Sequence, residues 1–488
     1  MLFTTVPFAL LFLPLTLVGF FAWARWSHAA AAAWLLVASL FFYGFWMPEF
    51  TLLLVASIGA NFALGLRLAR QPLGQRGAWL TAGVAFNLGL LAYFKYANFF
   101  VGSLNAALSW SLPGADVVLP IGISFYTFTQ IAFLVDVSRG KVHEVNPVHY
   151  GLFVTYFPHL IAGPVLHHGQ MMPQFRDAST YRLQPRMLAV GLSVFAIGLI
   201  KKVVLADGVA PYADAVFTPT DAGLTPSTAE AWLAALAYTL QLYFDFSGYS
   251  DMAIGLSLMF NVRLPFNFDS PYQARNISDF WRRWHISLST FLRDYLYIAL
   301  GGNRHGAVRR YANLATTMVL GGLWHGASWT FVFWGALHGA YLMVNHGFRA
   351  LCGEARLAWL ATQRWFTWPS WVLTMVAVVV AWVFFRATSF EGAARMLIAM
   401  AGEGGSPQAL WNAGLQAHAG WLWCGALGAL ALWAPNSNRI GLWLEQRASQ
   451  GAAWWPWWMG TVGLALALFM VLLNTVRDSV SAFIYFNF

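Results

Sequence analysis

Residues Ile277 to Tyr297 read ISDFWRRWHISLSTFLRDYLY, and they gather an unusual amount of chemistry for the chain in which they occur. Asp, Glu, Lys and Arg make up only 10% of the sequence, yet this stretch holds five of them, four tyrosine or tryptophan residues and His285. Charge concentrated in an apolar chain indicates either a membrane surface or the wall of a site. The neighbouring sequence helps to decide between a membrane surface and the wall of a site.

The composition of the chain indicates a membrane protein. Of its 488 residues 59% are hydrophobic, whereas soluble domains are roughly 45–50% apolar and about 25% charged. The 26 Trp and 17 Tyr suit the aromatic belts at membrane interfaces. The net charge of +9 lies in short loops between apolar segments, which favours membrane orientation and anionic lipid over nucleic acid as the partner of these charges. We therefore expect an all-α polytopic membrane protein that binds no nucleic acid.

Several apolar runs approach the roughly 20 residues that cross a bilayer. They are residues 8–24, 29–46, 50–66, 78–93, 188–200, 231–242, 371–385, 421–433 and 461–473. Alternating the first spans places Arg25 and the loop with Arg67, Arg70 and Arg76 on one side, and Glu49 on the other. By the positive-inside rule, this distribution predicts an N-terminus outside the cytoplasm.

The middle of the chain departs from simple hydropathy. Residues 117–137 and 155–175 carry prolines, glycines and hydroxyl side chains within apolar runs. Such interruptions at membrane depth are tolerated only where protein or a water-filled cavity covers the backbone. We expect a single membrane domain over residues 1–488, made of N-terminal spans (1–110), a catalytic core around a cavity (111–347) and C-terminal spans (348–488).

Drawn as one continuous helix, the opening stretch is amphipathic. Its apolar face includes Trp281 and Trp284, Asp279 and Arg283 share the opposite face, and His285 falls on the seam between them. Asp279 also precedes Arg282 and Arg283 at the spacing of helical ion pairs. Such a helix lies in the interface or re-enters the membrane, and an interfacial helix with a snorkelling polar face explains the pattern equally well.

Two flanking segments favour a site. Upstream, in QLYFDFSGYSDMAIGLS, Asp245 and Asp251 interrupt an apolar segment; they are functional candidates or buried partners of the nearby arginines. Downstream, in TMVLGGLWHGASWTFVFWGALHG, His325 stands in an apolar span. A neutral imidazole there suits general-base chemistry, because its unperturbed pKa lies near 6.5. Two histidines, a hydroxyl-bearing acceptor and an activated acyl donor would suffice for acyl transfer.

Other kinds of site find less support in the sequence. No zinc, di-iron or redox motif is present, so we expect no metal and no bound cofactor. The loop LGGNRHG and the residues after it carry Arg304, Arg309 and Arg310, which could attract an anionic donor from the cytoplasm. Positive-inside flanking charge is the simpler explanation of these three arginines.

The long motifs from Gln241 to Gly339 strongly resemble the membrane-bound O-acyltransferase (MBOAT) family, as do YFKYANFF, LPIGISFYTF and FPHLIAGPVL. The likeness is to its bacterial polysaccharide branch, typified by the alginate O-acetyltransferase membrane subunit. It implies about eleven transmembrane helices, with re-entrant or horizontal helices around a central funnel or tunnel. His325 matches the family's invariant catalytic histidine. His285 matches its second signature histidine, which is an Asn in many eukaryotic members.

The resemblance also implies the reaction and its setting. Members of this branch take acetyl groups from a cytoplasmic donor, here acetyl-CoA, and pass them across the bacterial inner membrane. A periplasmic or membrane-anchored serine-hydrolase-like subunit then acetylates the exopolysaccharide, alongside the synthesis and secretion machinery. Alginate is the first choice of polymer, with cellulose or another polymer open. Five side chains are expected to line or brace the tunnel: Trp324, Asp245, Asn276, Trp281 and Arg282.

Two alternatives to an acyltransferase remain. A transporter or flippase-like component of an exopolysaccharide secretion complex would use the same polar core without covalent chemistry. Inverted or parallel repeats would be its signature, and the sequence shows none. A scaffold role in the same complex predicts that both histidines tolerate substitution.

Overall fold

The computed structural model describes residues 1–115, 117–142, 146–161, 163–451, 454–475 and 483–484. Within these ranges the regular structure is helical and contains no strand. Six helical segments are long and apolar enough to cross a membrane: Pro7–Ala24, Pro48–Arg70, Gly77–Leu108, Pro185–Asp221, Arg364–Arg386 and Trp455–Thr475. Two shorter apolar helices are His28–Gly44 and Ile123–Ser138. The all-α, multi-pass prediction is confirmed, while the count of about eleven spans stays a prediction.

The chain divides into two compact units. The first unit comprises residues 1–200, 249–266 and the part after 437. Its helices are α1 (Leu13–Ala24), α2 (His28–Gly44), α3 (Pro48–Arg70), α4 (Gly77–Leu91), α5 (Ala97–Leu108), α6 (Ile123–Ser138), α7 (Pro147–Thr155), α8 (His168–Arg176), α9 (Pro185–Leu199), α21 (Ser437–Gln450) and α22 (Trp455–Thr475).

The second unit comprises residues 201–248 and 267–436. Its helices are α10 (Asp207–Asp221), α12 (Ile277–Arg283), α13 (Ile286–Phe291), α14 (Gly306–His325), α15 (Trp329–Cys352), α16 (Glu354–Thr362), α17 (Arg364–Arg386), α18 (Phe390–Met400), α19 (Ala409–Asn412) and α20 (Ala417–Trp433). The 32-residue α11 (Thr228–Met259) contributes residues 228–248 to this unit and its remainder to the first. The predicted run 231–242 lies inside α11.

Short π-helical and 3-10 turns adjoin these helices. The π-helical turns are Pro7–Phe12, Ala92–Tyr96, Ile200–Ala206 and Leu292–Tyr297, and the 3-10 turns are Leu73–Gln75, Ala178–Tyr181 and Pro271–Gln273. The turn Ala92–Tyr96 joins α4 to α5, so that the two form one apolar segment.

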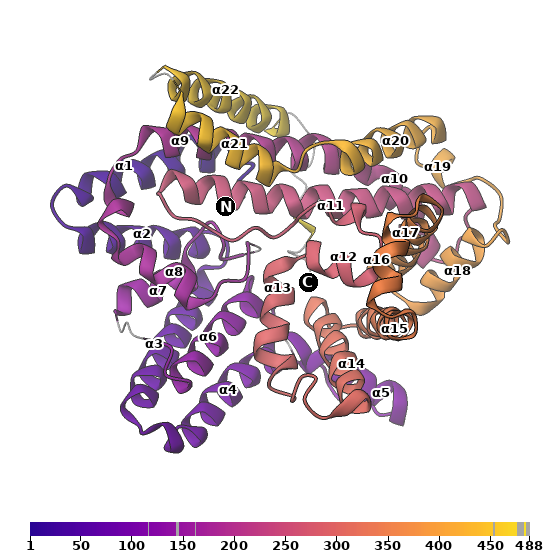
Figure 1. Cartoon of the computed structure of the whole chain (residues 1–488), viewed down its shortest axis with the longest axis horizontal. Coiled ribbons are helices and arrows are strands. Elements are labelled where there is room, and N and C mark those ends of the chain that lie inside the picture. Colours follow the sequence, from indigo (N-terminus) through magenta and orange to yellow (C-terminus); the bar gives the residue numbers. More distant parts are fainter. Residues whose placement is uncertain (116, 143–145, 162, 452–453, 476–482, 485–488) are drawn as a thin grey trace. The chain divides into compact units, whose positions relative to one another are not determined.

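Pairs of neighbouring helices build the first unit. The indigo helices α1 and α2 lie side by side, and α22 runs along α9 (Figure 1). Glycine allows this close approach, because a Cβ on Gly463 of α22 would meet the backbone N of Ser193 in α9 at 2.9 Å. Helices in lipid gain little from the hydrophobic effect between them, so that small residues and van der Waals packing hold such pairs together.

The Pro/Gly-rich stretch between α7 and α8 is buried in the first unit. From Tyr156 to Leu166, every described residue is buried, although the backbone forms no regular helix there. The prediction from residues 155–175 is thus confirmed in one respect: protein covers the irregular backbone, as membrane depth requires.

Candidate active site

His325 is the last residue of α14 and is only 2% exposed. Glycines let α14 pack tightly against α15, since a Cβ on Gly322 would meet the carbonyl oxygen of Phe331 at 2.2 Å and one on Gly335 would meet that of Met318 at 2.3 Å. The LGGLWHG and FWGALHG motifs therefore build a close helical hairpin. The C-terminal carbonyls of α14 stabilise positive charge on the imidazole when it takes up a proton.

The opening stretch is not one helix. α12 ends at Arg283, His285 adopts φ 45° and ψ 54°, and α13 begins at Ile286. The continuous wheel is therefore wrong, and His285 does not lie on a seam between two faces. The extended Trp284 and the left-handed His285 interrupt the helix and change the direction of the chain between the two short helices. His285 is buried at this break, with an exposure of 0%.

Asn267 fixes the proton on His285. The Asn267 Oδ1 accepts from the backbone N–H of Ser287 at 3.3 Å and from the Ser287 hydroxyl at 2.9 Å. It also lies 3.1 Å from His285 Nδ1. Because a backbone N–H only donates, the shared atom is an oxygen, so that His285 Nδ1 carries the ring proton. The lone pair of the neutral ring is then on Nε2.

Burial lowers the pKa of His285 to about 3. The residue lies between α12 and α13, outside the candidate membrane spans. Taking the ring out of water disfavours its charged form, so that His285 is neutral at neutral pH. It can accept a hydrogen bond at Nε2 and donate one at Nδ1.

The two predicted histidines meet in an aromatic enclosure. The ring centroids of His285 and His325 lie 6.3 Å apart. Phe246 meets the His285 ring edge-on at 4.7 Å, and Trp334 meets the His325 ring edge-on at 5.1 Å. Trp324, only 3% exposed, lies 5.0 Å from His325 and 6.1 Å from His285, centroid to centroid. An apolar enclosure around a base strengthens its electrostatic interactions with a reacting group.

Asp245 lies in an ion cluster that the sequence did not predict. Its carboxylate is 2.7 Å from Lys202 Nζ, which also donates to Asp207 at 2.8 Å. A pairing of Asp245 with an arginine of the opening stretch was one of two interpretations of the sequence, and the cation found 2.7 Å from its carboxylate is instead Lys202, far upstream. Asp251, in the first unit, accepts instead from the Ser437 hydroxyl at 3.0 Å.

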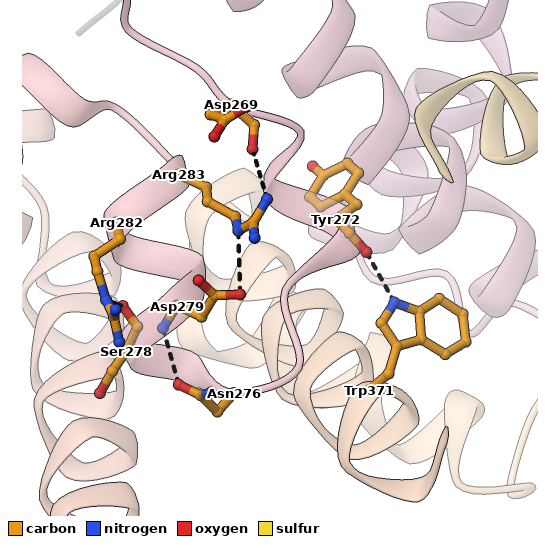
Figure 2. Close-up of polar contacts among 8 residues, drawn as sticks. All are labelled: Asp269, Tyr272, Asn276, Ser278, Asp279, Arg282, Arg283 and Trp371. Atoms are coloured by element: carbon orange, nitrogen blue, oxygen red, sulfur yellow. Dashed lines mark hydrogen bonds and ion pairs between the residues drawn. The ribbon is translucent and has the colours of Figure 1, made fainter. Parts of the chain in front are cut away.

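Around α12, the polar side chains cap the helix or form ion pairs and hydrogen bonds with its own residues and with the preceding loop (Figure 2). The Asn276 side chain caps α12 by accepting from the backbone N–H of Asp279 at 2.9 Å. The expected Asp279–Arg283 ion pair is confirmed at 3.1 Å, and Arg283 also donates to the carbonyl of Asp269. Arg282 is exposed and donates to the carbonyl of Ser278. Asn276 and Arg282 thus contribute to the start and the surface of α12.

Trp281 links α12 to α15. Its indole N–H donates to His338 Nδ1 at 3.3 Å. His338 was not predicted as a site residue, although it stands in the same FWGALHG motif as Trp334. Asn267 and Lys202 were also missed. A hydrophobicity pattern carries no signal for a hydrogen-bond partner that lies far away in sequence.

The three arginines lie at the other end of α14 from His325. Arg304 and Arg309 are exposed, and Arg310 stacks on Tyr311 at 4.6 Å. At about 1.5 Å per residue, Arg309 and His325 are about 24 Å apart along the helix. A donor that contacts both must be long and thin. Among the described residues, no three His, Cys, Asp or Glu side chains are close enough together to hold a metal ion.

Replacing Asn267 by Leu should destabilise the folded protein by about 1–3 kcal/mol, since buried donors on His285 and Ser287 would lose their acceptor. Thermal unfolding of the purified protein in detergent measures this loss. Asn267→Asp is the matched control, because it keeps an acceptor oxygen. If the Leu variant unfolds at the same temperature as the wild type, Asn267 does not hold the His285 turn.

Known proteins of similar sequence identify the family of this chain. The model of the MBOAT, membrane-bound O-acyltransferase family, matches residues 88–388. The chain is 47% identical to the probable alginate O-acetylase of Azotobacter vinelandii, over 82% of this chain and 78% of that protein. It is 43% identical to a peptidoglycan O-acetyltransferase of Helicobacter pylori, over 83% of this chain and 80% of that protein.

A more distant relative carries a different acyl group in its name. It is a teichoic acid D-alanyltransferase of Bacillus subtilis, 28% identical over 62% of this chain and 82% of that protein. The matched region 88–388 includes both His285 and His325 and the short helices between them. The chain is thus an enzyme of the membrane-bound O-acyltransferase family.

Proposed function

We propose that this enzyme takes an acetyl group from cytoplasmic acetyl-CoA and passes it across the bacterial inner membrane for O-acetylation of an exopolysaccharide. The buried pair of imidazoles, His285 and His325, is the observation that carries the proposal. The names of the alginate O-acetylase and the peptidoglycan O-acetyltransferase support acetyl as the group transferred. The N-terminus then lies in the periplasm, and Arg304, Arg309 and Arg310 attract the anionic donor from the cytoplasm.

In this proposal His325 is the general base. Its imidazole takes the proton of an acceptor hydroxyl, whose oxygen forms a bond to the acetyl carbonyl carbon. The carbon–sulfur bond of the thioester breaks, and the leaving thiolate takes up a proton. The carbonyl end of α14 stabilises the imidazolium formed in between. His285, 6.3 Å away between ring centroids, positions the reacting groups near the donor thioester.

The acceptor hydroxyl belongs to a partner. We propose a periplasmic or membrane-anchored serine-hydrolase-like subunit, working with the synthesis and secretion machinery of the polymer. Alginate is the first choice of polymer, in keeping with the relative at 47% identity. The peptidoglycan O-acetyltransferase covers a similar share of the chain at 43% identity, which makes a cell-wall polymer the second candidate.

The experiment that tests acyl transfer uses the purified protein in proteoliposomes with acetyl-labelled acetyl-CoA. We expect the thioester to be cleaved and free CoA thiol to accumulate when a periplasmic extract of the producing cell supplies the acceptor. A transporter or flippase component would leave the thioester intact while the label crosses the membrane unchanged. Intact thioester in the presence of a competent acceptor rejects the proposed function.

A further inference from the structure

His338 is a third buried histidine in the second unit. It is 0% exposed and lies on α15, one turn after Trp334. The ring centroids of His338 and Trp334 are 4.8 Å apart, and Trp334 in turn is 5.1 Å from His325. Trp334 therefore contacts both His338 and the predicted general base.

Trp281 determines which nitrogen of His338 carries the proton. An indole N–H can only donate, so that His338 Nδ1, 3.3 Å from Trp281 Nε1, must accept. The proton of the neutral ring is then on Nε2. His338 offers a donor at Nε2, whereas His285, held by Asn267, offers a lone pair there.

The Nε2–H of His338 is a buried donor for which the described part of the chain supplies no acceptor. A buried donor without an acceptor lowers the stability of the folded protein by about 1–3 kcal/mol. Native structures keep few such groups, and each one calls for a functional or structural explanation. A substrate oxygen that arrives in the site would supply the acceptor.

We propose that His338 is a catalytic residue that donates its Nε2–H to the carbonyl oxygen of the acyl donor's thioester, and that Trp281 is the positioning residue that holds His338 in this tautomer. The proposal rests on the acyl-transfer function above. Negative charge develops on that oxygen when the acceptor hydroxyl attacks the carbonyl carbon. A preorganised donor in an apolar enclosure stabilises this charge more than it stabilises the ground state.

Two substitutions separate the two nitrogens of His338. In His338→Asn the amide oxygen takes the place of Nδ1 and keeps an acceptor for Trp281, but no donor reaches the position of Nε2. In His338→Gln the amide nitrogen takes the place of Nε2 and keeps the donor. We expect kcat of the Asn variant to fall by on the order of 10–100-fold with little change in KM for acetyl-CoA, and the Gln variant to retain most of its activity.

Trp281→Phe tests the positioning role. It keeps an aromatic ring but removes the N–H that fixes the tautomer, so kcat should fall by several-fold in the wild-type background. In the His338→Gln background the same substitution should have no further effect, because an amide has no tautomers. A merely structural role for Trp281 would lower kcat in both backgrounds. If His338→Asn does not fold, the comparison of Trp281→Phe in the wild-type and His338→Gln backgrounds still tests the proposal.

The control is Asn345→Ala. The Asn345 side chain accepts from the Ser278 hydroxyl at 2.8 Å and forms another link between α12 and α15, two helical turns after His338. We expect it to keep wild-type kcat, which would exclude a general loosening of α12. The proposal is overturned if His338→Asn keeps wild-type kcat, if its loss appears only in KM, or if Trp281→Phe acts equally in both backgrounds. Failure of the wild-type protein to cleave the thioester would instead reject the function itself.

Discussion

His325→Ala is expected to lower acyl transfer by on the order of 10³-fold, the largest effect of any single substitution in this chain. His325 is 2% exposed at the end of α14, with the rings of Trp324, Trp334 and Phe385 within 5.3 Å between centroids. Because these aromatic rings enclose His325, no water molecule can take over as the general base once the imidazole is removed. The measurement is thioester cleavage at equal amounts of folded protein, together with the O-acetyl content of the polymer in cells.

The control for this prediction is His305→Ala. His305 is exposed in the loop before α14, at the opposite end of the same helix. It should leave the rate unchanged, which separates the loss of the buried base from the loss of any histidine on this element. A His325→Ala protein that keeps a tenth or more of the wild-type rate would contradict the role of His325 as general base.

Lys202→Met is expected to cause the largest loss of stability. Lys202 Nζ lies 2.8 Å from the carboxylate of Asp207 and 2.7 Å from that of Asp245, and the three side chains are 5%, 8% and 1% exposed. Removing this cation leaves two buried carboxylates facing each other. Breaking a buried ion pair from one side typically costs about 3–5 kcal/mol. A large drop in the midpoint of thermal unfolding in detergent, and in the yield of monodisperse protein, should follow.

Two further variants make the Lys202 result specific. Lys201→Met alters the neighbouring, less buried lysine, whose Nζ donates to the Ser247 hydroxyl at 3.4 Å, and should have a smaller effect. Adding Asp207→Asn and Asp245→Asn to Lys202→Met removes the uncompensated charges and should recover part of the lost stability. If Lys202→Met is as stable as the wild type, the ion cluster does not contribute to the fold.

Hydrophobicity and motifs in the sequence predicted the class of fold and placed two histidines in one site. His285 and His325 could be chosen because a titratable residue stands out in an apolar segment. Asn267, Lys202 and His338 could not, because their roles depend on partners 18, 43 and 57 positions away along the chain, respectively. Such distances are set by tertiary packing, which no local pattern records.

The break between α12 and α13 was missed for a different physical reason. A helical wheel assumes that every residue has helical backbone angles, and residues 277–297 contain no proline or glycine that would have signalled an interruption. The left-handed conformation of His285 is held instead by distant groups such as Asn267. Tertiary hydrogen bonds outweighed local helix propensity at this position.

The left-handed backbone of His285 also limits which amino acids evolution can place there. With φ at 45°, a β-branched residue would be strained, whereas Asn, Asp and His are several-fold enriched in this region among residues other than glycine. The family that this chain resembles has His or Asn at this position, and both residue types are compatible with this backbone conformation. The backbone therefore tolerates an exchange between His and Asn, in evolution and in protein engineering. Val, Ile or Thr would strain the backbone at this position, whatever the chemistry of the side chain.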